Sequence, residues 1–283
     1  MEAFLSLTFY TQLAVLIVSS VLLTWGLLEL VYHLVPAEKR LTSNDVTAFV
    51  FGSLGIFSAL VISSVLVMAL NHFDAAGNAV AAEANMLADL DRAARGLSPG
   101  FAKDLSVKLT HYLEIVSVLE WDHKNKPANS NKERAAVNDL SKFISQYEPK
   151  DLREAGYHQA VVERLGQFYD ARRTRSSVAG DSISPQVLVV SLLVGVLTLV
   201  FALLYGAQSK LMHLILVSLL TMAMATTYSL ILVFDSPFHG DLVVSNEPYT
   251  KVISHIAKNN AWDAEQEAKE KAAQATQPAA TKK

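Results

Sequence analysis

Residues 46–70, VTAFVFGSLGIFSALVISSVLVMAL, carry no charged side chain. About 20 residues of helix cross the hydrocarbon core of a bilayer, because each residue adds about 1.5 Å of length. No helix-breaking residue separates this stretch from residues 71–76, and the alanine-rich sequence beyond contains Glu83, Asp89 and Arg92. That continuation favours helix but is too polar for lipid. One helix is therefore predicted to cross the membrane and to continue into a water-exposed domain.

The composition indicates a membrane protein and excludes several kinds of chemistry. Of the 283 residues, 51% are hydrophobic, and they are clustered rather than spread along the chain. The formal net charge of −3 gives no general attraction to nucleic acid, so no nucleic-acid partner is predicted. Because the chain has no cysteine, disulfides, thiolate catalysis, iron–sulfur clusters and cysteine-ligated zinc are excluded.

Three further apolar runs accompany residues 46–70. One of them ends at Pro36, where a helix cannot continue, and another begins after Pro185, which suits the first turn of a helix. The fold class they predict is an all-α integral membrane protein, with four transmembrane helices and a helical cytosolic insertion between the second and third. The lipid bilayer is thus the first predicted partner. The predicted segments are 1–35 (N-terminal segment and first crossing), 46–70 (second crossing), 71–185 (soluble helical domain), 186–206 (third crossing), 211–234 (fourth crossing), 235–261 (C-terminal cytosolic segment) and 262–283 (solvated or disordered tail).

The insertion is predicted to be a bundle of helices, because its apolar residues recur at helical spacing. One stripe runs from Val80 to Leu97 and another from Leu105 to Leu119. Further helices are expected over 133–147 and from about residue 150. Residues 124–132 are predicted to form a loop, and the sequence from Gln274 onward is expected to be disordered.

Four crossings place the N-terminus, the insertion and the C-terminal segment on one side of the membrane. Basic residues flank both faces, so the positive-inside rule does not choose between them. No secretion or disulfide signal is present, so the N-terminus, the helical domain and the C-terminus are expected in the cytoplasm.

The even number of crossings also places a cluster of charged residues on one side of the membrane, where the chain leaves the bilayer. Asp235 and Asp241 follow the fourth crossing, on the side where Arg172, Arg173 and Arg175 precede the third. An anion at a helix C-terminus is disfavoured by about 0.3–1 kcal/mol, so Asp235 needs compensation. Either aspartate is predicted to pair with one of the arginines; the alternative is that the arginines contact lipid phosphates.

The second crossing has a face of small residues and a face of bulky ones. Gly52, Ala59 and Ser63 recur with Ile56 at a spacing that commonly lets two helices approach closely. The alternative is a stripe facing a pore. The candidates for a pore constriction are Phe49, Ser53, Ile56, Phe57 and Leu60.

No motif of an enzyme is present: the sequence has no HExxH, phosphate-binding loop, GxSxG or glycine-rich dinucleotide turn. The histidines are scattered, and pairs such as His239 with Asp241 are more typical of a loop than of a metal site. No catalytic residue, metal ligand or cofactor is predicted.

Three short motifs carry a resemblance to a known family. They are Glu83-Ala84-Asn85 after the second crossing, Ala171-Arg172-Arg173-Thr174-Arg175 before the third, and the D-x-P-F-x-G turn of Asp235, Pro237, Phe238 and Gly240 after the fourth. With the order of crossings, they make residues 13–249 similar to the bestrophin-like family of bacterial membrane proteins. The family residues assigned on this basis are Glu83, Asn85, Pro237, Phe238 and Gly240.

The resemblance implies a pentameric, anion-conducting channel in the bacterial inner membrane, with inorganic ions as partners. In bestrophins the second helix narrows the pore with bulky apolar residues one turn apart, and the nearest equivalents here are Ile56 and Leu60. The position one turn earlier is Gly52. The run of acids that binds calcium in animal bestrophins is reduced here to Asp241 and Glu247, so calcium gating is not expected. The alternative function is a non-conducting scaffold or sensor whose helical domain binds a partner.

Overall fold

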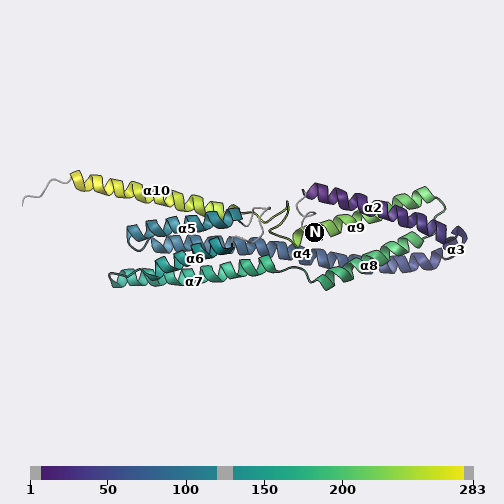
Figure 1. Ribbon diagram of the computed structural model, residues 1–283, viewed down its shortest axis with the longest axis horizontal. Helices are drawn as coiled ribbons and strands as arrows, with labels where there is room; N and C mark the ends of the chain where they lie inside the picture. Colours follow the sequence, from purple (N-terminus) through teal and green to yellow (C-terminus); the bar gives the residue numbers. More distant parts are fainter. Residues whose placement is uncertain (1–7, 120–129, 277–283) are drawn as a thin grey trace, which may run out of the picture. The chain divides into compact units, whose positions relative to one another are not determined.

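The structure, a computed structural model, describes residues 8–119 and 130–276. These residues form helices and connecting turns with no strand, which confirms the predicted all-α class (Figure 1). The helices are α2 (Phe9–Leu34), α3 (Ala37–Thr42), α4 (Asn44–Ala94), α5 (Pro99–Leu119), α6 (Ser130–Ser145), α7 (Leu152–Gly180), α8 (Pro185–Leu204), α9 (Lys210–Phe234) and α10 (Glu247–Thr276).

The chain divides into two compact units. The membrane unit consists of the described residues of 1–76 and 178–244, and the helical unit of those of 77–177 and 245–283. Helix α4 is continuous over 51 residues and contributes to both units. This confirms the prediction that the second crossing continues as the first helix of the polar domain.

Four helices are long and apolar enough to cross a membrane: α2, α4, α9 and the apolar part of the stretch Leu152–Leu204, which is α8. Within the membrane unit, α2 lies beside α9 (Figure 1). Two polar contacts join these helices: the Thr24 and Thr221 hydroxyls are 3.2 Å apart, and the Trp25 indole donates to Ser218 over 2.8 Å. Polar side chains in a bilayer find partners on neighbouring helices because lipid supplies none.

The inward side of α4 packs on the other membrane helices. Ile62, Val65 and Ala69 are buried against Ile183 and Ile231, and their spacing of three or four residues defines one face of the helix. The prolines act as expected, since α2 ends just before Pro36 and α8 begins at Pro185.

The two short turns of the membrane unit are held together by Asn44 and Gly206. The Asn44 amide donates to the Gly206 carbonyl and accepts from the Gly206 N–H, each over 2.7 Å. A Cβ added at Gly206 would lie 2.7–2.8 Å from main-chain atoms of Arg40 and Leu41. The glycine is therefore needed for this close approach of backbones.

We expect Gly206→Ala to destabilise the membrane unit by about 1–3 kcal/mol, because the contacting atoms are backbone and move only with the turn. Thermal unfolding of the full-length protein in detergent measures the change. Gly26→Ala is the matched control, because a Cβ there meets no atom within 4 Å. Equal melting temperatures for both variants would contradict the packing argument.

The helical unit is built from the apolar stripes predicted for it. Val80, Leu87 and Leu90 of α4 are fully buried, as are Leu105 and Leu109 of α5. Helices α6, α7 and α10 surround the same core, which includes Leu140, Phe168 and Ile256. The unit is thus a helix bundle whose stripes pack on one another.

The sequence-based boundaries of α6 and α10 are wrong, and α6 also ends at Ser145 rather than at residue 147. Helix α6 begins at Ser130, so the last three residues of the loop predicted for 124–132 are helical, and residues 124–129 lie outside the described residues. Serine and acidic residues suit the first turn of a helix, which explains the earlier start. Helix α10 extends to Thr276, past the predicted onset of disorder at Gln274. Alanine, glutamine and lysine are strong helix formers, so the helix continues beyond its last packed turn.

Candidate functional site

The predicted constriction residues lie on one exposed face of α4. Phe49, Ser53, Ile56, Phe57 and Leu60 are all exposed in the single chain, with Phe49 at 77%, Ile56 at 69% and Leu60 at 63%. The buried stripe of the same helix is on its other side. We call these five residues the α4 face, and this face does not pack against other described residues of the chain.

The small residues beside the α4 face are equally open. Gly52, Ala59 and Ser63 are exposed, and a Cβ added at Gly52 or Gly55 meets no atom within 4 Å outside its own helix backbone. These small residues therefore make no close helix packing with the described residues of the chain. Both sequence-based alternatives for this helix, packing against a neighbour and lining a pore, stay predictions.

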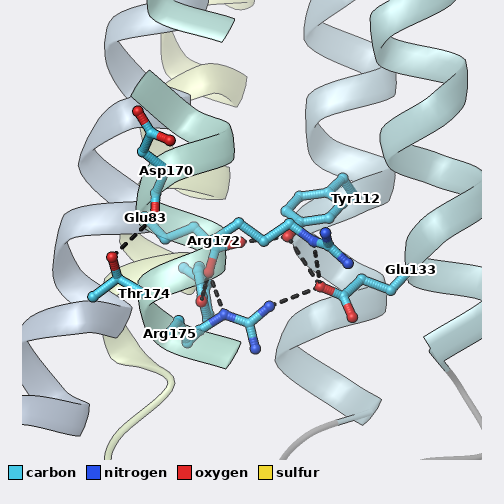
Figure 2. Close-up of polar contacts among 8 residues, drawn as sticks. Glu83, Tyr112, Glu133, Asp170, Arg172, Thr174 and Arg175 are labelled. Atoms are coloured by element: carbon cyan, nitrogen blue, oxygen red, sulfur yellow. Dashed lines mark hydrogen bonds and ion pairs between the residues drawn. The ribbon is translucent and has the colours of Figure 1, made fainter. Parts of the chain in front are cut away.

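The helical unit contains a buried charge network formed by side chains of α4, α6 and α7 (Figure 2). The side chains of Glu83 on α4 and Arg175 on α7 are fully buried and paired through the arginine Nε. Arg175 also donates to Glu133 Oε1 of α6 over 2.8 Å, and Arg172 donates to the same oxygen over 2.8 Å. Two arginines and two glutamates balance in charge, as burial requires.

Two tyrosines complete the hydrogen bonds of Glu83. The Tyr112 hydroxyl, from α5, donates to Glu83 Oε1 and lies 3.4 Å from Glu133 Oε1. The Tyr249 hydroxyl, from α10, donates to Glu83 Oε2 over 3.0 Å. Glu83 therefore receives donors from α5, α7 and α10, and it connects the first turns of α10 to the bundle.

The network changes the proton affinity of two of its members. Burial raises the pKa of Tyr112 well above its usual value of 10.0, and the negative charge of Glu83 raises it further. For Arg172 burial acts to lower the pKa, but the hydrogen bond and the charge of Glu133 outweigh it, so the pKa is raised. Burial and the neighbouring charges thus favour a neutral Tyr112 and a charged Arg172.

Tyr112 gives the folded protein a specific sensitivity to alkali. The unfolded chain loses the Tyr112 proton near pH 10.0, whereas the folded chain retains it to higher pH. Above pH 10 the folded state therefore binds one more proton, and this contribution to stability falls by about 1.4 kcal/mol per pH unit. Between about pH 9 and about pH 11, we expect the melting temperature of Tyr112→Phe to fall less steeply with pH than that of the wild type. Identical slopes would contradict this assignment.

A second cluster joins α10 to the end of α4. Arg95 donates to Asp91 over 2.9 Å, to Asn260 over 3.1 Å, and also to Asp263. Asp91 is buried and accepts from Ser106 of α5 over 2.6 Å. These contacts and Tyr249 fix α10 along the bundle at two levels.

The two aspartates predicted at the membrane exit accept main-chain N–H groups of the membrane unit. Asp235 accepts from Ile183 over 2.7 Å, just before α8, and Asp241 accepts from Phe9 over 3.2 Å. Arg173 lies 3.6 Å from the Asp170 carboxylate, an exposed pair. The predicted pair between an aspartate and one of the three arginines would join the two units, and it stays a prediction.

The D-x-P-F-x-G turn has a defined local structure. Phe238 is buried, the Val244 N–H donates to the Pro237 carbonyl over 2.9 Å, and Gly240 has φ 101°. Only glycine adopts that φ at no cost, which explains its place in the motif. Of the other family residues, Glu83 lies in the buried charge network and Asn85 is exposed.

Tyr112, Glu133 and Tyr249 were not predicted as parts of a site. A signal was present for the network, because Glu83 occupies a position of the apolar stripe, three residues after Val80 and four before Leu87. An acid on a buried stripe requires a buried partner. The sequence does not say which helix supplies it.

No group of three or more metal-ligating side chains occurs among residues 8–119 and 130–276. The fold is that of a multi-pass helical membrane protein with a second, helical unit, and α4 contributes to both units. The chain belongs to the bestrophin-like family, because the family model of the bestrophin-like domain matches residues 18–249. This confirms the resemblance found in the sequence.

Solved structures show the same fold. A crystal structure of a glycine-to-alanine variant of a membrane protein matches with a TM-score of 0.66 and 14% identity, covering 87% of this chain and 98% of that one. A proline-to-alanine variant of a membrane protein matches with a TM-score of 0.62 and 15% identity, covering 86% and 97%. No curated protein matches the chain by sequence.

Proposed function

We propose that the protein is an oligomeric ion channel that conducts anions, with chloride the first candidate, and that the α4 face forms its constriction. The observation that carries the proposal is the exposure of this face, which no other part of the described protomer covers. In a bestrophin-like protein, the natural place for such a face is an axis shared by several copies.

The proposed constriction works through wetting. Ile56 and Leu60 are one helical turn apart, so a ring of copies places two apolar layers around the axis. A narrow apolar layer excludes water and ions when it dries and admits them when it is wet. Ser53 lies one turn before Phe57, and its hydroxyl lowers the free energy needed to place water beside the aromatic ring.

The preference for anions rests on membership of the family. The charges of Arg172 and Arg175 are matched by Glu83 and Glu133, so these arginines supply little net field at the channel mouth. A pentameric ring in the bacterial inner membrane, with the N-terminus, the helical unit and the C-terminus in the cytoplasm, belongs to the same proposal.

Reconstitution of the full-length protein into planar bilayers tests the proposed conduction. Under a tenfold gradient of potassium chloride, we expect current that reverses near the chloride equilibrium potential, about 59 mV from zero. Reversal near the potassium potential would overturn the anion preference but leave a channel. Absence of current, together with a monomer or dimer in mild detergent, would favour the scaffold alternative.

A further inference from the structure

Arg40 is a buried charge in the membrane unit. It lies in α3, between the first two crossings, and is only 4% exposed. Its Nε donates to the Val35 carbonyl over 3.3 Å, and its guanidinium carbon lies 3.7 Å from the centre of the Tyr32 ring. The Nη1 atom is buried and has no hydrogen-bond partner among the described residues.

No described carboxylate balances this charge. The ion pairs of residues 8–119 and 130–276, taken at 4.0 Å or less, include none with Arg40. The acid nearest in the chain sequence to Tyr32, Glu29, is bound to Lys210 over 2.6 Å. A buried guanidinium without a counter-charge costs several kcal/mol, and a cation–π contact offsets only about 2 kcal/mol of it.

The guanidinium is held in place by its surroundings. The Arg40 main chain contacts Gly206, and Tyr32 is itself fixed by its hydroxyl, which lies 3.2 Å from His213 Nδ1. The Nζ of Lys210 lies 5.5 Å from the same aromatic ring. Arg40 is thus a preorganised donor rather than a flexible surface side chain.

The location of Arg40 indicates what supplies the missing charge. It lies where α2 ends and α4 begins, which is the depth of the lipid headgroups for two helices that cross the bilayer. The planar guanidinium presents paired N–H donors that match two oxygens of a phosphate group. Basic positions at this depth attract phosphate-bearing headgroups.

We propose that Arg40 binds a phosphate group at this edge of the membrane unit. The phosphate belongs to a phospholipid headgroup or to free inorganic phosphate, since both offer the same oxygens. The residues on either side of Arg40 in the chain, Lys39 and Leu41, are exposed, so this part of α3 lies at the surface of the membrane unit. The site is independent of conduction and of the α4 face.

The experiment uses the full-length protein in a neutral detergent, compared with Arg40→Gln and Lys39→Gln. The second variant makes the same change of charge one residue away, on an exposed side chain. Native mass spectrometry measures binding of phosphatidylglycerol against diacylglycerol with the same acyl chains, which lacks the phosphate. Thermal unfolding with inorganic phosphate, at matched ionic strength, tests the soluble source.

The wild type and Lys39→Gln are expected to bind phosphatidylglycerol at least about tenfold more tightly than diacylglycerol, and Arg40→Gln to lose this preference. Stabilisation by inorganic phosphate alone, absent in Arg40→Gln, would assign the site to free phosphate. Equal binding by Arg40→Gln and wild type, or no binding of either probe, would overturn the proposal.

If Arg40→Gln does not fold, Arg40→Lys replaces it. Lysine keeps the charge but removes the planar pair of donors, so phosphate binding should weaken by about tenfold while the protein stays folded. Undiminished binding by Arg40→Lys would overturn the proposed recognition.

Discussion

Replacing Glu83 with alanine should lower the free energy of unfolding of the helical unit by about 3–5 kcal/mol. Glu83 is fully buried and accepts hydrogen bonds from Arg175, Tyr112 and Tyr249. Its removal takes one carboxylate from a buried guanidinium and one hydrogen-bond acceptor from each of the two tyrosine hydroxyls. The loss is large because it leaves charge and polar groups uncompensated, not because the pair itself is strongly stabilising.

Chemical unfolding of the full-length protein in detergent, followed by circular dichroism, measures this loss. Asp170→Ala is the matched control, because it also removes an acid paired with an arginine but the pair is exposed and 3.6 Å long. Exposed pairs contribute about 0–1 kcal/mol, so the control should unfold almost as the wild type does. A Glu83→Ala variant as stable as Asp170→Ala would contradict the role assigned to the network.

The layout of the membrane unit was predictable because it depends on local sequence. An uncharged run of sufficient length specifies a crossing, and prolines at 36 and 185 mark two of the ends. The continuity of α4 could be predicted for the same reason, since nothing between residues 70 and 77 breaks a helix. Boundaries at Ser130 and Thr276 were missed because end turns of a helix are weakly specified by composition.

The partners of the buried charges were not predictable in the same way. The even number of predicted crossings places Arg172 and Arg175 on one side of the membrane. It does not say which of the carboxylates on that side pairs with them. Glu133 comes from a helix about forty residues earlier, and its side chain meets theirs only because α6 packs beside α7. An apolar stripe predicts that two helices pack, but not which polar side chains face each other.

The α4 face raises a different problem, because an exposed apolar residue fits lipid, a neighbouring subunit or a pore. The sequence pattern is the same in all three cases, and so is the exposure measured on one protomer. A reagent that reaches the α4 face from the aqueous solution distinguishes a pore from the other two environments.

The proposed pore is tested most directly by single cysteines, because the chain has none of its own. Ile56→Cys and Leu60→Cys place a thiol on the α4 face, and Leu192→Cys places one on α8, where the side chain is 54% exposed. A charged thiol reagent is added to channels in planar bilayers, and the current is recorded before and after. Mass spectrometry confirms which thiols have reacted.

We predict that the reagent lowers the current of Ile56→Cys and Leu60→Cys by at least about tenfold, because a bulky adduct then occupies the constriction. The current of Leu192→Cys should not change. Full reaction at positions 56 and 60 with no change in current would contradict the assignment of the α4 face to the pore.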